Sequence, residues 1–162
     1  MTTKNMTNRI EQLWKEWLAI SERLQGLLHE QTVALTMRDT ARLEKLQPAI
    51  DTVVEKLGTV DAEAVAMGKK LAEELGCEPS LRGLTQALEK ADAQRLQQIA
   101  NRVIVSERQA SHVMKKNRSL IENELEHIGG TLALIAREAS IPTNPYLHPS
   151  PATHAVVMNA VA

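Results

Sequence analysis

The sequence has very few aromatic residues. Its 162 residues include no phenylalanine, one tyrosine and two tryptophans, and the β-branched residues fall at helical rather than alternating spacing. Because β-strands favour aromatic and β-branched residues in alternation, this usage argues against sandwiches and barrels. The abundant Leu, Ala, Glu, Gln, Lys and Arg are typical of long helices.

Cysteine, net charge and long apolar runs are also scarce. The single cysteine, Cys77, excludes an intramolecular disulfide framework and fits a reducing compartment. Nineteen basic and 20 acidic residues give a net charge of −1, so no general electrostatic attraction to nucleic acid or anionic membrane is expected. The N-terminal MTTKNMTNRI has no apolar signal region, and no apolar run approaches the ~20 residues of a membrane span. We expect a cytoplasmic, all-α protein.

Two segments carry apolar residues at alternating three- and four-residue spacing, which predicts one-sided helices. The first runs from about residue 7 to 37, and the second follows the N-cap residue Asp39 and ends at Leu75-Gly76. Pro48 predicts a kink in the second helix or a start delayed to that residue. Because a short connection joins two helices of similar length, we expect an antiparallel hairpin.

The last predicted helix is longer than the hairpin. A linker with a short helix occupies residues 77–90, after which Asp92 is a candidate N-cap for a helix reaching about Ala139. Such a helix would be about 70 Å long, against about 45–55 Å for each hairpin helix. The sequence therefore predicts a coiled-coil-like three-helix bundle whose last helix overhangs the hairpin.

The overhanging end is unusually apolar. Residues 127–136, HIGGTLALIA, contain no Asp, Glu, Lys or Arg. If no other part of the chain covers them, they are where another protein binds. Asn117 lies upstream on the same seam, where a polar residue either fixes the helix register or offers a polar contact to a docked helix.

The last 23 residues differ from the rest of the chain. Residues 140–162 contain four prolines and, apart from two histidines, no acidic or basic residue. Proline at this density cannot continue a helix, so an extended tail is expected. The predicted organisation is a helical domain at 1–139 and a Pro-rich tail at 140–162.

Motifs for catalysis are missing from the sequence. No GxGxxG, GxxxxGK[ST], HExxH or paired CxxC occurs. Glu124 and His127 form one ExxH, but a four-helix di-iron site requires two such motifs and further carboxylates. A locally basic set is better explained as a solvated face than as a nucleic-acid groove, because it has no interleaved aromatics. It comprises Arg102, Arg108, Lys115, Lys116 and Arg118. We expect no enzyme activity, no metal and no cofactor.

Three short motifs, in this order, resemble the FlgN family of flagellar export chaperones. They are LLHE at 27–30, Asp39 with Leu43 and Leu46 at the start of the second helix, and the stretch Lys115 to Ile121 with Asn117, Leu120 and Ile121. The resemblance extends over residues 10–139 and implies a helical chaperone. Such a protein would cover amphipathic terminal helices of flagellar hook-associated proteins, prevent their premature assembly and aid their delivery to the type III export apparatus.

The resemblance also implies particular site residues. The client groove would consist of Asn117, Leu120, Ile121, Leu125, Ile128, Leu132 and Ile135, and Tyr146 would contact the export gate. A homodimer is compatible with the same apolar seam. The alternative function is that of a coiled-coil adaptor or self-associating structural protein.

Overall fold

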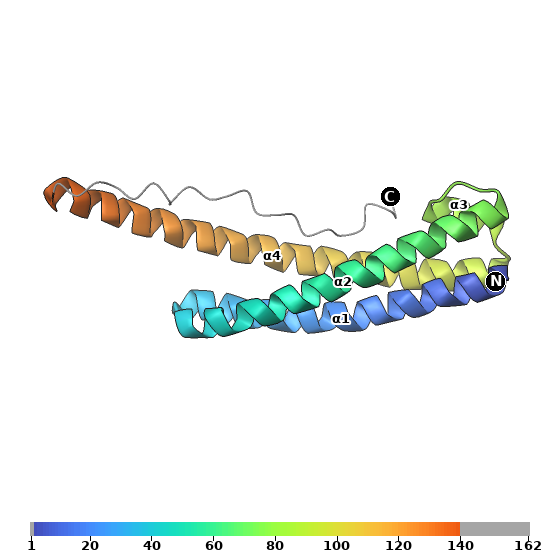
Figure 1. Ribbon diagram of the computed structural model, residues 1–162, viewed down its shortest axis with the longest axis horizontal. Coiled ribbons are helices and arrows are strands. Elements are labelled where there is room, and N and C mark those ends of the chain that lie inside the picture. Colours follow the sequence, from blue (N-terminus) through green and yellow to red (C-terminus); the bar gives the residue numbers. More distant parts are fainter. Residues whose placement is uncertain (1, 140–162) are drawn as a thin grey trace.

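The computed structural model describes residues 2–139 and shows four α-helices, with no strand in that range (Figure 1). They are α1 (Thr3–Met37), α2 (Thr40–Leu75), α3 (Leu81–Ala87) and α4 (Lys90–Ala139). The predicted all-α fold, with a long hairpin and a longer final helix, is confirmed. The predicted tail and Tyr146 lie outside the described residues.

Side-chain caps and a glycine set most of the helix ends. The Thr2 hydroxyl accepts a hydrogen bond from the Asn5 amide at 3.4 Å, and α1 begins about a turn earlier than predicted. The Asp39 carboxylate accepts from the Arg42 amide at 3.0 Å, as its prediction as an N-cap requires. Gly76 ends α2 with φ 62°, a left-handed conformation that glycine adopts without steric cost.

The prediction for the start of the last helix is wrong. Helix α4 begins at Lys90, so Asp92 lies within its first turn rather than at the cap. The Asp92 carboxylate instead accepts a hydrogen bond from Arg95 at 2.5 Å, which raises the pKa of the Arg95 guanidinium. Of the two outcomes predicted for Pro48, the delayed start does not occur: helix α2 begins at Thr40 and runs through Pro48, and buried Leu46 and Ile50 hold this part against the core. A kink at Pro48 stays a prediction.

Helices α1 and α2 form the antiparallel hairpin. Ion pairs join Arg9 to Glu63 at 3.2 Å near one end and Glu30 to Arg42 at 3.6 Å near the tip. Large apolar side chains of both helices fill the core between them. The buried set includes Ile10, Leu13, Trp14, Trp17, Leu24 and Leu28 of α1 and Leu46, Ile50, Val53, Leu57, Val60 and Leu71 of α2.

Helix α4 packs along α1 and runs parallel to it (Figure 1). Contacting pairs keep a nearly constant separation in sequence: 87 for Asn8 and Arg95, 85 for Ser21 and Ser106, and 86 for Arg38 and Glu124. A constant separation over the length of α1 means that the two helices stay in one register. Because α1 packs against both α2 and α4, it is the central helix, with α2 on one flank and α4 on another.

Candidate partner-binding face on α4

Two polar layers interrupt the apolar contact between α1 and α4. In the first, the Ser21 and Ser106 hydroxyl oxygens lie 2.8 Å apart, and the Gln25 amide donates to the Ser106 hydroxyl at 3.0 Å. Buried hydroxyl and amide groups stabilise a structure only when they are paired. This layer therefore favours the observed register over one that would place Ser106 against an apolar residue.

The second layer is centred on Asn117, whose side chain is 2% exposed. Its amide nitrogen donates to the Leu28 carbonyl at 2.9 Å and to Gln31 Oε1 at 2.8 Å, and its Oδ1 accepts from the Thr32 hydroxyl at 2.6 Å. Within residues 2–139 no buried side-chain nitrogen or oxygen is left without a hydrogen-bond partner. The geometry of Asn117 is that of a residue that fixes the register of α4 on α1.

The hairpin ends nearly two turns beyond this layer. Arg38, the C-cap of α1, has φ 55° and reaches across to the Glu124 carboxylate of α4 at 3.1 Å. The chain then reverses into α2 at Thr40. Helix α4 continues past this point for about 15 residues, or ~22 Å, beyond the hairpin tip (Figure 1).

The apolar seam of α4 continues over this overhang, where none of the other described helices covers it. Leu96, Val103 and Ala110 of the seam are buried against the hairpin. Five later seam residues, Ile121, Leu125, Ile128, Leu132 and Ile135, have exposed fractions of 38–51%. We call these five residues the distal stripe. Its side chains share one helix face because their spacing alternates between four and three residues.

The other sequence-predicted site residues lie at the edge of this stripe or outside the described range. Leu120 is half-buried beside the hairpin tip, and Asn117 is enclosed within the α1–α4 contact. Tyr146 falls in the part of the chain that the structure does not describe. The structure therefore aligns five of the predicted residues as one exposed face.

Sequence reasoning missed the partners of the two polar layers. Gln31 falls at a seam position of α1, where a polar residue is a signal of such a layer, but Thr32 and Gln25 lie off the seam and carry no such signal. A second signal was available: Ser106 and Asn117 are eleven residues apart, as are their partners Ser21 and Thr32. Equal spacing of polar residues on two helices indicates a parallel pair in register.

The neighbourhood of the stripe offers little for catalysis or metal binding. Glu124 forms the ion pair with Arg38, His127 is exposed, and no group of three His, Cys, Asp or Glu within residues 2–139 is placed to hold a metal ion. The basic residues Arg102 and Arg108 are exposed on α4. In the described part of the chain no helix is long and apolar enough to cross a membrane.

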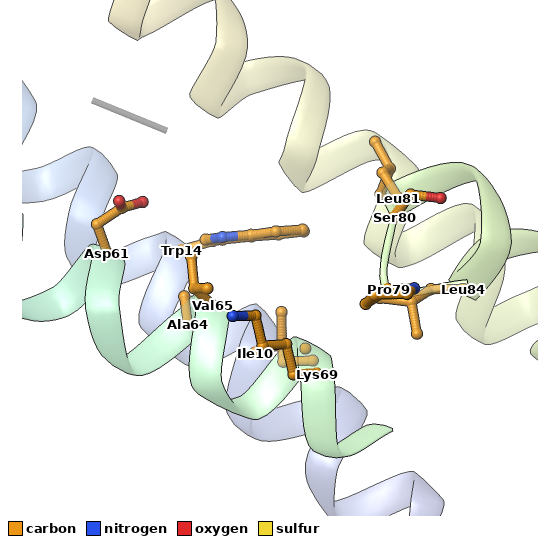
Figure 2. Close-up of a pocket in the computed structure, with 11 residues that line it drawn as sticks. Ile10, Trp14, Asp61, Ala64, Val65, Lys69, Pro79, Ser80, Leu81 and Leu84 are labelled. Atoms are coloured by element: carbon orange, nitrogen blue, oxygen red, sulfur yellow. The ribbon is translucent and has the colours of Figure 1, made fainter. Parts of the chain in front are cut away.

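One partly enclosed cavity lies at the other end of the molecule. It has a volume of about 60 Å³ and lies between α1, α2 and the segment Pro79–Leu84, with the Trp14 indole pointing across it (Figure 2). Small-molecule sites typically have about 300–1,000 Å³. This cavity is too small for such a ligand. A second hollow of about 480 Å³, beside Gly76 and Gly83, is wide open to solvent and so encloses a ligand poorly. The distal stripe is therefore the candidate site for a partner.

These features describe an elongated helical protein whose last helix presents an exposed apolar face beyond the hairpin tip. The FlgN protein family matches residues 1–146, which is most of the chain. The protein therefore belongs to the FlgN family of flagellar export chaperones. No curated protein matches the chain, and neither does any solved structure.

Proposed function

We propose that this protein is a cytoplasmic, non-enzymatic chaperone that binds amphipathic terminal helices of flagellar hook-associated proteins on its distal stripe. It prevents their premature assembly and aids their delivery to the type III export apparatus, where Tyr146 contacts the export gate. The observation that carries the proposal is the exposure of the distal stripe, whose five side chains are 38–51% exposed. An amphipathic helix laid into an apolar groove is a recurrent mode of peptide recognition, and it requires no catalytic group.

The size of the stripe sets the expected affinity. Fully burying a Leu or Ile side chain contributes about 1.5–3 kcal/mol, so covering five side chains that are already about half buried contributes on the order of 5 kcal/mol. A similar contribution from the client helix is opposed by an association cost of about 4–15 kcal/mol. The expected dissociation constant is roughly micromolar or weaker, which suits a chaperone that must release its client.

In this proposal Asn117 contributes to the client groove indirectly, without touching the client. Because its amide already pairs with α1, Asn117 acts below the client surface by holding α4 in place. Leu120 and Ile121 then form the end of the groove nearest the hairpin, and Ile135 forms the far end.

Isothermal titration calorimetry of the full-length protein against C-terminal helical segments of hook-associated proteins from the same organism tests the proposal. The wild type should bind one-to-one, and the double variant Leu125→Asp, Ile128→Asp should lose binding. Leu134→Asp is the matched control. Leu134 is 63% exposed within the same apolar segment but lies on another side of the helix from Leu132, so this variant should bind normally.

The alternative function predicts a different result from the same proteins. A self-associating structural protein would bind no client segment, and the double variant would instead lose its oligomeric state. Failure of a folded wild type to bind any of the segments would therefore refute the chaperone function proposed here.

A further inference from the structure

We propose that a bound client helix takes the place of the hairpin beyond its tip. It lies end-on to residues 36–40, covers the distal stripe alone and is limited to about four turns. This inference rests on the proposed function and specifies the size and position of the helix that the stripe accepts. It is argued from the register of α1 and α4, the continuity of their contact, and the distribution of charge around the stripe.

The register shows which contact the client helix would extend. Separations of 85–87 residues between paired positions hold from Asn8 and Arg95 to Arg38 and Glu124. By the same separation, Leu125 to Ala139 of α4 would face residues 39–53 if α1 continued straight. The chain instead turns back at Arg38. The apolar seam of α4 therefore continues beyond the point where α1, its packing partner, ends.

The stripe is continuous with an existing helix-packing surface. Val103, Ala110 and Ile121 follow one seam, along which the exposed fraction rises from 0% at Val103 to 38% at Ile121 at the tip. A face of this kind already has the spacing that an apolar helix requires. A partner helix on the stripe would therefore pack on α4 much as the hairpin does on the preceding turns.

The hairpin tip limits the length of that partner. The tip residues Thr36, Met37 and Asp39 are exposed, and the Arg38–Glu124 ion pair closes the α1–α4 contact beside them. A client helix extending past the tip would have to leave the stripe and run over the outer face of the hairpin. Near the tip the hairpin surface also carries exposed charged residues, the ion-paired Glu30 and Arg42. About 15 residues, or ~22 Å, are left for the helix to occupy.

The charges also fit an apolar occupant. No Asp, Glu, Lys or Arg occurs between Glu126 and Arg137, so the far part of the stripe has no charged residue with which to select a charged partner. Recognition there depends on the shape and apolar area of the partner helix. The client segment is therefore an amphipathic helix with a strongly apolar face over about four turns.

A second copy of the chain is a poorer occupant of the stripe. A helix about 22 Å long and 10 Å wide offers a face of roughly 220 Å² per copy, or about 440 Å² for two copies. Stable protein–protein interfaces bury about 1,200–2,000 Å² in total. Pairing of two overhangs is too small for a permanent dimer, whereas a small contact is suitable for transient binding of a client.

A series of client peptides of increasing length tests this inference. Peptides of about 8, 15, 22 and 30 residues, nested within one hook-associated C-terminal helix and sharing its apolar face, are titrated into the full-length protein. The affinity should rise at least tenfold between the first two lengths and then level off. A continued rise with the longest peptide would mean that the client runs alongside the hairpin, which would overturn the inference but leave the proposed function standing.

Disulfide cross-linking locates the ends of the bound peptide. In a Cys77→Ser background, single cysteines are introduced as Thr36→Cys at the tip or Arg137→Cys at the far end, and each is paired with a peptide that carries a cysteine at one terminus. One peptide terminus should cross-link to position 36 and the opposite terminus to position 137. Glu63→Cys on α2 is the control that should not cross-link. Cross-linking of an internal peptide position to position 36 would contradict an end-on arrangement.

Measurements on the free protein distinguish a client helix from the two other possible occupants of the stripe, which are the chain itself and a second copy. Hydrogen exchange of the full-length monomer should show weak protection of amides in the stripe and strong protection when the 15-residue peptide is present. Strong protection in a free monomer would show that the chain covers its own stripe. A dimer that the double variant Leu125→Asp, Ile128→Asp disrupts would identify a second copy as the occupant. Either result would overturn the inference, whereas failure of every peptide to bind a folded protein would refute the proposed function itself.

Discussion

The Thr32 hydroxyl of α1 donates a hydrogen bond to Asn117 Oδ1 of α4 at 2.6 Å, across 85 positions of sequence. The Asn117 amide nitrogen donates at the same time to the Leu28 carbonyl and to Gln31 Oε1. This group of buried hydrogen bonds lies just before the hairpin ends. It fixes α4 against α1 shortly before α4 extends past the hairpin tip, so the overhang is anchored at its base.

Removing the Asn117 side chain should destabilise the protein. Asn117→Ala removes the donor to buried Gln31 Oε1 and one acceptor of the half-buried Thr32 hydroxyl, which keeps its hydrogen bond to the Leu28 carbonyl. The change should lower the free energy of unfolding by about 2 kcal/mol. Urea denaturation followed by circular dichroism measures the change. Asn123→Ala is the control: Asn123 is exposed on the same helix, and its replacement should leave stability unchanged or raise it by a few tenths of a kcal/mol. Equal effects of the two variants would contradict the structural role of Asn117.

Charges on the distal stripe should be tolerated by the fold. Leu125→Asp with Ile128→Asp should change the free energy of unfolding by less than about 1 kcal/mol, because both side chains are nearly half exposed. Val103→Asp places a charge at a seam position that is 0% exposed, and should cost about 4 kcal/mol or more. Thermal unfolding of the wild type, the double variant and Val103→Asp measures the loss of stability in each variant. A large loss of stability in the double variant would show that the stripe is already covered.

Two glycines should respond to alanine in opposite directions. A Cβ at Gly83 of α3 would lie 2.3 Å from the Glu78 carbonyl oxygen, a backbone atom that cannot rotate away. Gly83→Ala should therefore cost about 1–3 kcal/mol. A Cβ at Gly68 of α2 would meet no atom within 4 Å, so Gly68→Ala should stabilise the helix by about 0.5–1 kcal/mol. Denaturant midpoints report both changes, and stabilisation by Gly83→Ala would mean that the connection before α3 does not approach this helix closely.

Client binding should depend little on salt. Charged residues are missing from 127–136, so screening of surface charges should leave most of the contact unaffected. Titrations at low and high sodium chloride should give dissociation constants within about threefold of each other. A decrease in affinity of an order of magnitude or more at high salt would contradict this prediction. It would show that charged residues such as Glu122 or Glu126 contribute most of the client binding.

Much of the helical framework was predictable because its causes are local. Apolar residues at three- and four-residue spacing predicted the long helices, Asp39 predicted the start of α2, and Gly76 predicted its end. The prediction failed at the start of α4, where Asp92 pairs with Arg95 within the first turn instead of capping the helix. Both arrangements use the same residue types, and only their positions in space distinguish them.

The sequence by itself determined the helices, their lengths and hence the existence of an overhang, because periodicity, capping and rise per residue act within one segment. The tertiary structure decided that α4 runs parallel to α1, that Asn117 pairs with Thr32, and that the covered part of the seam ends near Ile121. Those outcomes depend on which helices meet and in which register. A heptad seam offers nearly equivalent apolar contacts at each seven-residue shift, so the buried polar layers of Ser106 and Asn117 are what select one register.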